Sequence, residues 1–177
     1  MGQGPRAAKS FLLQMAGAPG SGKSALARLI GQTTGAVVLD KDVLKTAALE
    51  AGVDDDQRAG AVAYESFFAL ADHLLGQGLS VVLDSPSFYE PIPAKGAAIA
   101  EARFVPYYFI ECVCDDREEL ARRLRDRPRL RSNPGEEALE DDHETIGPPG
   151  AYLRIDTTQP LDRCLGLALD YIGISAR

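Results

Sequence analysis

Five apolar runs along the chain alternate with stretches in which apolar residues recur every three or four positions. The apolar runs, which we expect to be strands, cover residues 10–16, 36–40, 79–84, 105–114 and 151–156. The stretches between them, which we expect to be helices, cover residues 23–33, 43–52, 57–76, 94–102, 116–127 and 160–172. Apolar strands that alternate with helices are typical of a parallel sheet covered on both faces. The pattern therefore predicts an α/β fold.

Acidic residues stand at the ends of three of these predicted strands. Asp40 and Asp42 end the second strand, Asp84 ends the third, and Asp156 ends the fifth. In parallel sheets of this kind, ligands gather at the carboxyl ends of the strands. We therefore expect some of these carboxylates to act on a ligand or on a metal ion.

The first predicted strand runs directly into a glycine-rich segment, GAPGSGKS, that has the form G-x-x-x-x-G-K-S. Bare backbone amides bind phosphate oxygens when side chains stay out of the way, and the following helix presents its N-terminus to the anion. A plain glycine-rich turn would explain the glycines but not the lysine and serine that follow. The predicted phosphate cradle consists of Gly17, Ala18, Pro19, Gly20, Ser21, Gly22, Lys23 and Ser24.

The chemistry of phosphoryl transfer assigns candidate roles to these residues. Lys23 would reach the outer phosphates, and the Ser24 hydroxyl would bind Mg²⁺. Asp84 is the candidate acid that holds Mg²⁺ through water, although it could instead cap the turn before Ser85 and Pro86. Asp42 is the candidate base for the acceptor hydroxyl, although it could also cap a helix that starts at Val43, and Asp40 rivals it for either acidic role.

An arginine-rich segment follows the fourth predicted strand. Arg123 and Arg127 lie four residues apart on one predicted helical face, and Pro128 ends that helix. We expect a lid over about residues 122–150 whose guanidinium groups neutralise charge on the transferred phosphoryl group and exclude water. The alternative is a solvated basic face that pairs with neighbouring carboxylates.

Composition limits the classes of partner. The 177 residues are enough for one domain, with residues 1–9 as a flexible tail. A net charge of −7 argues against a general nucleic-acid binder, and no run approaches the roughly 20 apolar residues that cross a membrane. Three cysteines argue against a disulfide framework and suit a reducing cytoplasm. We therefore expect a cytoplasmic protein, and none of these patterns indicates its oligomeric state.

Together, these residues resemble the small P-loop kinases of the nucleoside monophosphate kinase-like group, including AAA-type predicted kinases, from Phe11 to about Ile172. The segment LDKDVLK at 39–45 resembles the D-x-D segment of adenylylsulfate and gluconate kinases. It is also similar to the single-Asp segment of chloramphenicol phosphotransferase and polynucleotide kinase, where that residue faces the acceptor hydroxyl. On this alignment Asp42 is the acceptor-orienting residue, and Lys45 stands where an arginine is usual.

The same resemblance implies the fold and the cofactors. It implies the three-layer α/β/α fold of P-loop NTPases, with a five-stranded parallel sheet in the order 2-3-1-4-5 and a helical lid. Arg123 and Arg127 match the lid arginines, and the segment IDTT at 155–158 matches the loop that borders adenine, which makes Thr158 a candidate nucleotide-binding residue. ATP and Mg²⁺ are the implied cofactors.

The leading hypothesis is ATP-dependent phosphorylation of a hydroxyl group on a small molecule. A nucleotide-dependent switch or motor is a second hypothesis, but the chain lacks an N-K-x-D segment that would read guanine. A binding protein without turnover is a third, and a polynucleotide-end kinase is disfavoured by the net charge. The residues expected to line the acceptor site are Asp54, Arg58, Tyr64, Ser87, Phe88 and Tyr89.

Overall fold

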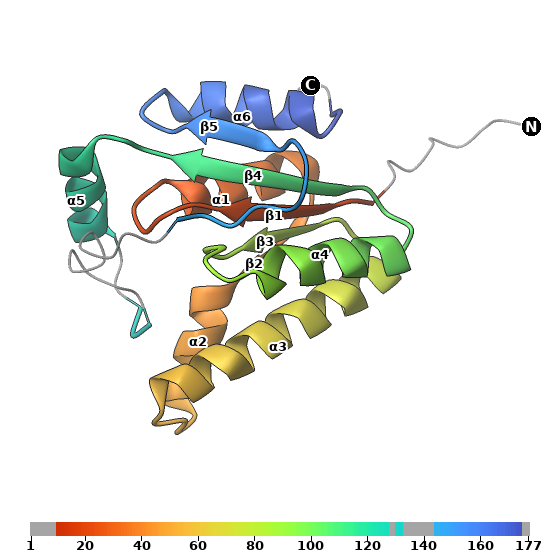
Figure 1. Cartoon of the computed structure of the whole chain (residues 1–177), viewed down its shortest axis with the longest axis vertical. Helices are drawn as coiled ribbons and strands as arrows, with labels where there is room; N and C mark the ends of the chain where they lie inside the picture. The colour runs from red at the N-terminus through yellow and green to blue at the C-terminus, as the bar shows by residue number, and fades with distance from the viewer. Residues whose placement is uncertain (1–9, 128–129, 133–143, 175–177) are drawn as a thin grey trace, which may run out of the picture.

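The computed structural model describes residues 10–127, 130–132 and 144–174, so the predicted tail at 1–9 lies outside the described residues. One five-stranded sheet forms the centre of the molecule, in the order β2-β3-β1-β4-β5 (Figure 1). All neighbouring strands are parallel. The strands are β1 (Leu12–Ala16), β2 (Val37–Asp40), β3 (Val81–Asp84), β4 (Tyr107–Val113) and β5 (Leu153–Asp156). The predicted fold class and strand order are confirmed.

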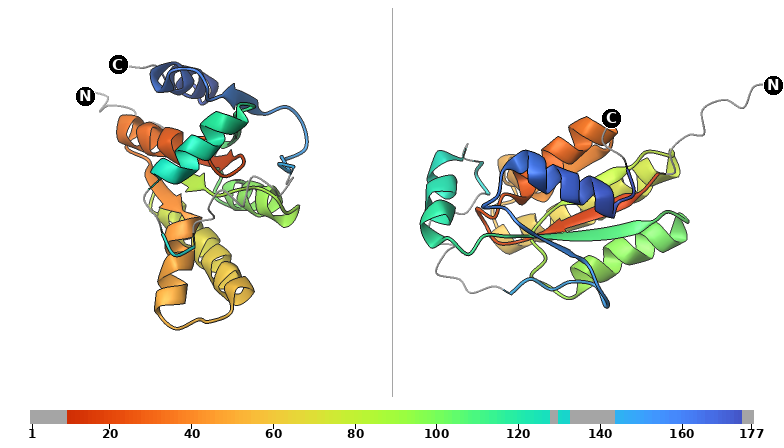
Figure 2. Two further views of the ribbon diagram at one scale, coloured as in Figure 1. Left: turned by 90° about the vertical axis from the view of Figure 1, so that its left-hand side faces the viewer. Right: turned by 90° about the horizontal axis from the view of Figure 1, so that it is seen from above.

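Helices cover both faces of the sheet and its carboxyl edge. They are α1 (Lys23–Thr34), α2 (Lys41–Glu50), α3 (Asp56–Gly76), α4 (Pro91–Ala102), α5 (Arg117–Asp126) and α6 (Leu161–Tyr171). Helices α1 and α6 pack on one face and α3 and α4 on the other, while α2 and α5 stand at the carboxyl ends of the strands (Figures 1 and 2). None of the described helices is long and apolar enough to cross a membrane.

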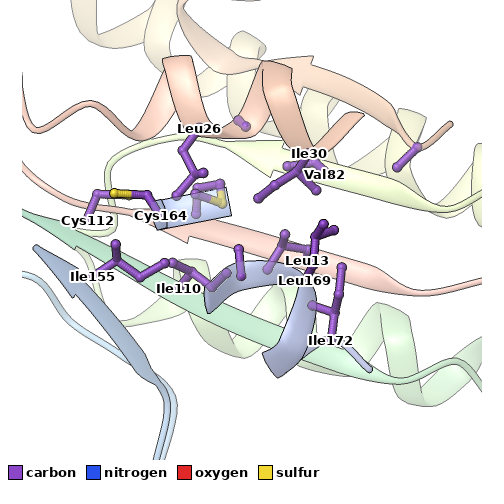
Figure 3. Close-up of a cluster of buried hydrophobic side chains, with 14 of the residues drawn as sticks. Leu13, Leu26, Ile30, Val82, Ile110, Cys112, Ile155, Cys164, Leu169 and Ile172 are labelled. Atoms are coloured by element: carbon purple, nitrogen blue, oxygen red, sulfur yellow. The ribbon is translucent and has the colours of Figure 1, made fainter. Parts of the chain in front are cut away.

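Two apolar cores hold these layers together. Leu12 and Leu13 are both fully buried because consecutive residues of the central strand β1 point to opposite faces of the sheet. Leu13 packs with side chains of α1 and α6, and Figure 3 labels ten members of this core: Leu13, Leu26, Ile30, Val82, Ile110, Cys112, Ile155, Cys164, Leu169 and Ile172. Leu12 packs with Phe67 and Phe68 of α3 in the second core. Burial on both sides fixes the sheet and therefore the position of its carboxyl edge.

Helices α2 and α4 begin more than one residue earlier than the sequence pattern predicts. Helix α2 starts at Lys41 rather than at residue 43, because the Asp40 side chain caps it by accepting a hydrogen bond from the amide of Asp42 (2.8 Å). Asp40 is therefore the N-cap, and the alternative prediction that Asp42 has this role is wrong. Helix α4 starts at Pro91 rather than at residue 94, since proline lacks an amide hydrogen and fits the first turn of a helix.

We expect Leu13→Ala to lower the free energy of unfolding by about 2–5 kcal/mol, because it opens a cavity in a closely packed core. Urea denaturation measures this loss. The control is Leu167→Ala on α6, where the native side chain is 41% exposed and the expected change is below about 1 kcal/mol. Equal losses in the two variants would contradict the described packing.

Candidate active site

The loop between β1 and α1 has the backbone shape of a phosphate cradle. Gly17, Gly20 and Gly22 all have positive φ angles (133°, 81° and 85°), which side-chain-bearing residues rarely adopt. A Cβ atom on Gly17 would also collide with the backbone carbonyl oxygen of Cys112 on β4. Gly22 directly precedes the first turn of α1, so the loop ends at a helix N-terminus. The loop thus needs glycine for its conformation and, at Gly17, for space as well.

A cavity of about 680 Å³ opens beside this loop. Its described lining comes mainly from the loop, α1, α5 and the chain from Thr157 into α6, with single residues from β2, α2 and position 130. Its charged members are Lys23, Arg28, Asp40, Glu119, Arg122, Arg123, Asp126 and Arg127. Cations outnumber carboxylates in this set. Lys23 is only 6% exposed, so its ammonium group acts in a poorly solvated environment. The cavity therefore suits a highly charged anion.

A buried carboxylate lies next to the cradle. Asp84 is 3% exposed, and its Oδ1 atom has no hydrogen-bond partner among the described residues. Burial raises the pKa of Asp84, and the neighbouring carboxylates of Asp40 and Asp42 raise it further, against the opposing effects of Lys23 and Ser24. Asp40 lies directly opposite Asp84 in the pairing of β2 with β3.

These residues fit a magnesium ion. A carboxylate oxygen without a partner, beside the Ser24 hydroxyl, is the kind of donor set that Mg²⁺ takes when its remaining ligands are waters and phosphates. Within the described ranges, no group of three or more His, Cys, Asp or Glu side chains could hold a metal ion. Any ion at this place would therefore depend on phosphate and water oxygens for most of its coordination.

Asp42 lies between two cationic partners. Its carboxylate pairs with Lys41 Nζ (2.6 Å) and with Arg127 Nη2 (3.3 Å), and its side chain is 14% exposed. Burial alone would raise the pKa of Asp42, but Lys41, Lys23 and Arg127 outweigh it and hold the pKa below the ordinary value. Asp42 is therefore an ionised carboxylate at neutral pH.

A second cavity, of about 560 Å³, is lined in part by Lys41, an ion-pair partner of Asp42. Residues from α2, α3, α4 and the loop after β3 line it, including Lys41, Lys45, Asp56, Gln57, Tyr64, Phe68, Phe88, Tyr89 and Lys95. Lys41, a partner of Asp42, lines this cavity, whereas Arg127, the other partner, lines the first. Asp42 itself is not among the described lining of either cavity, but each of its two ion-pair partners lines one of them.

Only some of the residues that the sequence predicts around the acceptor site line the second cavity. Tyr64, Phe88 and Tyr89 line the second cavity, but Asp54, Arg58 and Ser87 are not among its lining residues. Ser87 is buried, and its hydroxyl donates to the carbonyl oxygen of Ile146 (2.6 Å). Sequence analysis missed Lys41 and Lys95, whose surroundings have no local pattern that marks a site.

Arg123 binds the cradle rather than extending into open solvent. Its guanidinium donates to the carbonyl oxygen of Thr157 (2.7 Å), to the Thr157 hydroxyl (3.1 Å) and to the carbonyl oxygen of Gly20 (3.4 Å). Glu119, one turn earlier on α5, forms an ion pair with it (2.7 Å). These contacts fix α5 against the cradle and against the segment after β5.

The predicted lid is described only in part, because residues 128–129 and 133–143 lie outside the described residues. The described residues 131 and 132 contact α2. Ser132 Oγ donates to the carbonyl oxygen of Asp42 (2.7 Å), and Arg131 Nη1 donates to that of Leu49 (3.0 Å). Leu130 lines the first cavity. This segment therefore contacts the helix that carries Asp42.

Thr157, which the sequence did not single out, contacts the cradle directly. Its buried hydroxyl donates to the carbonyl oxygen of Ser21 (2.6 Å), and its amide donates to that of Val113 (2.9 Å). The predicted nucleotide-binding residue Thr158 instead bonds Asp156 Oδ1 through its hydroxyl (2.7 Å), and it is not among the residues that line the first cavity. Its role in nucleotide binding stays a prediction.

Solved structures share this fold. APS kinase CysC of Mycobacterium tuberculosis, in complex with AMPPNP and APS, is 22% identical with a TM-score of 0.69, covering 93% of this chain and 98% of that one. A sugar kinase from Janibacter is 18% identical with a TM-score of 0.67 and coverages of 94% and 96%. A gluconokinase from Sinorhizobium meliloti is 20% identical with a TM-score of 0.59 and coverages of 93% and 93%.

Comparison of the sequence with protein families identifies the family of this chain. None of the curated proteins matches the chain. Residues 12–149, however, match the AAA_33 family, whose description is AAA domain. This range contains the glycine-rich cradle, the strand-end carboxylates Asp40, Asp42 and Asp84, and the arginine-rich helix α5. The chain therefore belongs to the AAA_33 family of AAA domains, and its fold is that of the P-loop kinases.

Proposed function

We propose that this protein is an ATP-dependent kinase that transfers the γ-phosphoryl group of ATP to a hydroxyl group of a small molecule. The observation that carries the proposal is the position of Asp42. Its two cationic partners belong to different cavities, Arg127 to the one beside the cradle and Lys41 to the other. A carboxylate held between these two partners is suited to orient an acceptor from one cavity towards a phosphate in the other.

The nucleotide side of the proposal rests on the cradle. Its amides, the N-terminus of α1 and the buried Lys23 together offer the donors and the positive charge that a triphosphate needs. APS kinase, which shares the fold, binds the ATP analogue AMPPNP. Arg123 would keep α5 against the cradle, and Arg127, one turn later, would neutralise charge on the transferred group.

The acceptor side rests on the ionised Asp42. In the proposed reaction its carboxylate accepts a hydrogen bond from the acceptor hydroxyl and orients that oxygen towards the γ-phosphorus. The new oxygen–phosphorus bond forms as the bond to the β–γ bridging oxygen breaks and ADP leaves. The hydroxyl proton passes to Asp42 and then to solvent. The low pKa of Asp42 suits this late proton transfer, because positioning rather than strong basicity is what phosphoryl transfer requires.

Ser24 and Asp84 are the residues that would hold Mg²⁺, Ser24 directly and Asp84 through water. When bound, the ion supplies positive charge to the phosphate oxygens. Without a cation, the Asp84 carboxylate is buried with one oxygen unpartnered among the described residues and with two other carboxylates nearby. The proposed role therefore also accounts for a group that is otherwise costly to keep at this position.

A screen for ADP release in the presence of ATP and Mg²⁺ tests the proposal. Hydroxyl compounds such as polyols, sugar acids and nucleosides are added one at a time. A kinase consumes ATP steadily only when an acceptor is present. Steady hydrolysis that no added compound changes would instead indicate a switch or another ATPase, and failure to bind ATP would contradict the nucleotide assignment itself.

We expect Lys23→Ala to weaken AMPPNP binding about 10- to 100-fold, because it removes a charged hydrogen-bond donor from a poorly solvated site. Isothermal titration calorimetry measures the affinity, and ADP release should fall with it. Arg103→Gln is the control, since Arg103 is bound to Asp72 at the surface, away from both cavities. Unchanged AMPPNP affinity in Lys23→Ala would contradict the cradle assignment.

Asp42→Asn should lower acceptor-dependent ADP release by about 100-fold or more, because an amide cannot take the hydroxyl proton. AMPPNP affinity should stay within about 3-fold of the unmodified protein, since Asp42 is not among the described residues that line the first cavity. Asp72→Asn, which removes an exposed carboxylate from α3, is the matched control. Normal turnover in Asp42→Asn would remove this residue from the mechanism.

For Asp84→Asn we expect two opposite effects on thermal stability. The pKa of Asp84 is raised, so its ionisation at neutral pH destabilises the ligand-free protein, and the neutral amide should leave the melting temperature equal or higher. The Mg²⁺ concentration needed for half-maximal stabilisation by AMPPNP should rise about 10-fold. Differential scanning fluorimetry measures both quantities. An unchanged Mg²⁺ requirement would mean that Asp84 does not hold the ion.

A further inference from the structure

We propose that the acceptor is an anion, namely a hydroxyl compound that also carries a carboxylate, sulfate or phosphate group. This inference rests on the proposed kinase function and names the class of substrate that the second cavity takes. Its basis is the charge of that cavity. The charged residues among its described lining are three lysines, Lys41, Lys45 and Lys95, and one carboxylate, Asp56.

The lysines approach the cavity from different elements. Lys41 and Lys45 belong to α2, whereas Lys95 belongs to α4, which is far away in the sequence. The protein as a whole has a net charge of −7, so a cationic cavity is not a consequence of its composition. The fold brings three lysines and one carboxylate to this lining, and such an excess of positive side chains attracts ligands of the opposite sign.

The three ammonium groups are not equivalent. Lys41 is bound to the Asp42 carboxylate, which is 14% exposed, so Lys41 belongs to the end of the cavity where the hydroxyl group would react. Lys45 pairs with Asp56 and Lys95 pairs with Glu65, and both of these carboxylates are 75% exposed. Ion pairs with such solvated partners contribute little to stability. A bound oxyanion can therefore replace Asp56 and Glu65 without a large cost.

Aromatic rings surround these cations. Lys95 Nζ lies 5.5 Å from the ring centre of Phe68, and Lys41 Nζ lies 5.7 Å from that of Tyr64. The rings of Tyr64 and Phe68 are stacked against each other. Apolar walls lower the local dielectric constant and so strengthen the attraction between an ammonium group and an oxyanion. Lys45 and Lys95 would thus bind the anionic group while the rings contact the body of the acceptor.

The cavity offers few uncharged hydrogen-bonding side chains to a neutral polyol. The described lining offers one amide side chain, Gln57, and the phenol groups of Tyr64 and Tyr89. The Tyr64 hydroxyl already donates to the carbonyl oxygen of Pro86 (3.2 Å). Sites that recognise neutral sugars need several such hydrogen-bonding groups, because unpaired hydroxyl groups lose their bonds to water on binding. The lining therefore favours a charged acceptor over an uncharged one.

A binding experiment tests this inference without knowledge of the true acceptor. The protein is first saturated with Mg²⁺ and AMPPNP, which occupies the cradle, and sodium sulfate is then titrated at constant ionic strength. Amide chemical shifts measured by NMR report the binding. We expect saturable shifts in α2 and α4, and a sulfate affinity at least 5-fold weaker in Lys45→Gln combined with Lys95→Gln. The control Arg103→Gln should leave the affinity unchanged, because Arg103 lies outside the cavity.

Sulfate binding that is absent, or that the double variant does not weaken, would overturn the inference. This result is separate from a failure of the proposed function. If AMPPNP does not bind, the kinase proposal fails, but sulfate shifts in α4 still report on the second cavity because no residue of α4 is among the described lining of the first.

Turnover of matched compounds gives an independent test. The pairs are gluconate with sorbitol, glycerol 3-phosphate with glycerol, and 4-hydroxymethylphenyl sulfate with benzyl alcohol, which separate carboxylate, phosphate and sulfate from neutral partners. We expect ADP release to be stimulated by anionic members, and the double lysine variant to raise their KM at least 10-fold with a smaller effect on kcat. Turnover of neutral members alone would leave the kinase proposal intact and overturn the anionic acceptor.

Discussion

Negative charge accumulates at the carboxyl edge of the sheet, and the rest of the site balances it. Asp40, Asp42 and Asp84 lie within electrostatic reach of one another, and two of them raise the pKa of the third. The buried Lys23 opposes this repulsion by lowering the pKa values of both Asp42 and Asp84. A nucleotide adds further negative charge at the same place. The arginines of α5 and a magnesium ion are the means of compensation that the proposed function requires.

This balance of charge depends on the fixed positions of β1 and of the cradle that follows it. Leu12 and Leu13 anchor β1 in the two cores, and Gly17 follows a few residues later in a conformation that leaves no room for a side chain. Thr157 binds the cradle from the far side of β4, and Arg123 binds both Thr157 and Gly20. The cradle is thus fixed by its own strand, by the segment after β5 and by α5, so its amides do not have to be ordered when the ligand arrives.

The sequence was informative wherever the determining interactions are local. The glycine spacing and the apolar strands depend on neighbouring residues, so the turns of the glycine-rich loop and most element bounds could be predicted. The strand order was instead implied by the resemblance to a known family. The start of α2 was missed because two aspartates compete for the cap and only Asp40 has the required side-chain contact. The cationic cavity could not be predicted, because Lys41 and Lys95 come together only through the packing of α2, α3 and α4. Thr157 was missed in favour of its neighbour for a similar reason, since only the fold shows which of the two hydroxyls faces Ser21.

Helix α2 contacts a segment that lines the first cavity and itself carries residues that line the second. It carries Lys41, Asp42 and Lys45, and the described segment 130–132 bonds its backbone at Asp42 and Leu49. Leu130 of the same segment lines the first cavity. A ligand that displaces this segment from one cavity therefore also alters the anchoring of the residues in the other. In the proposed kinase, linkage then requires nucleotide and acceptor to change each other's affinity by one common factor.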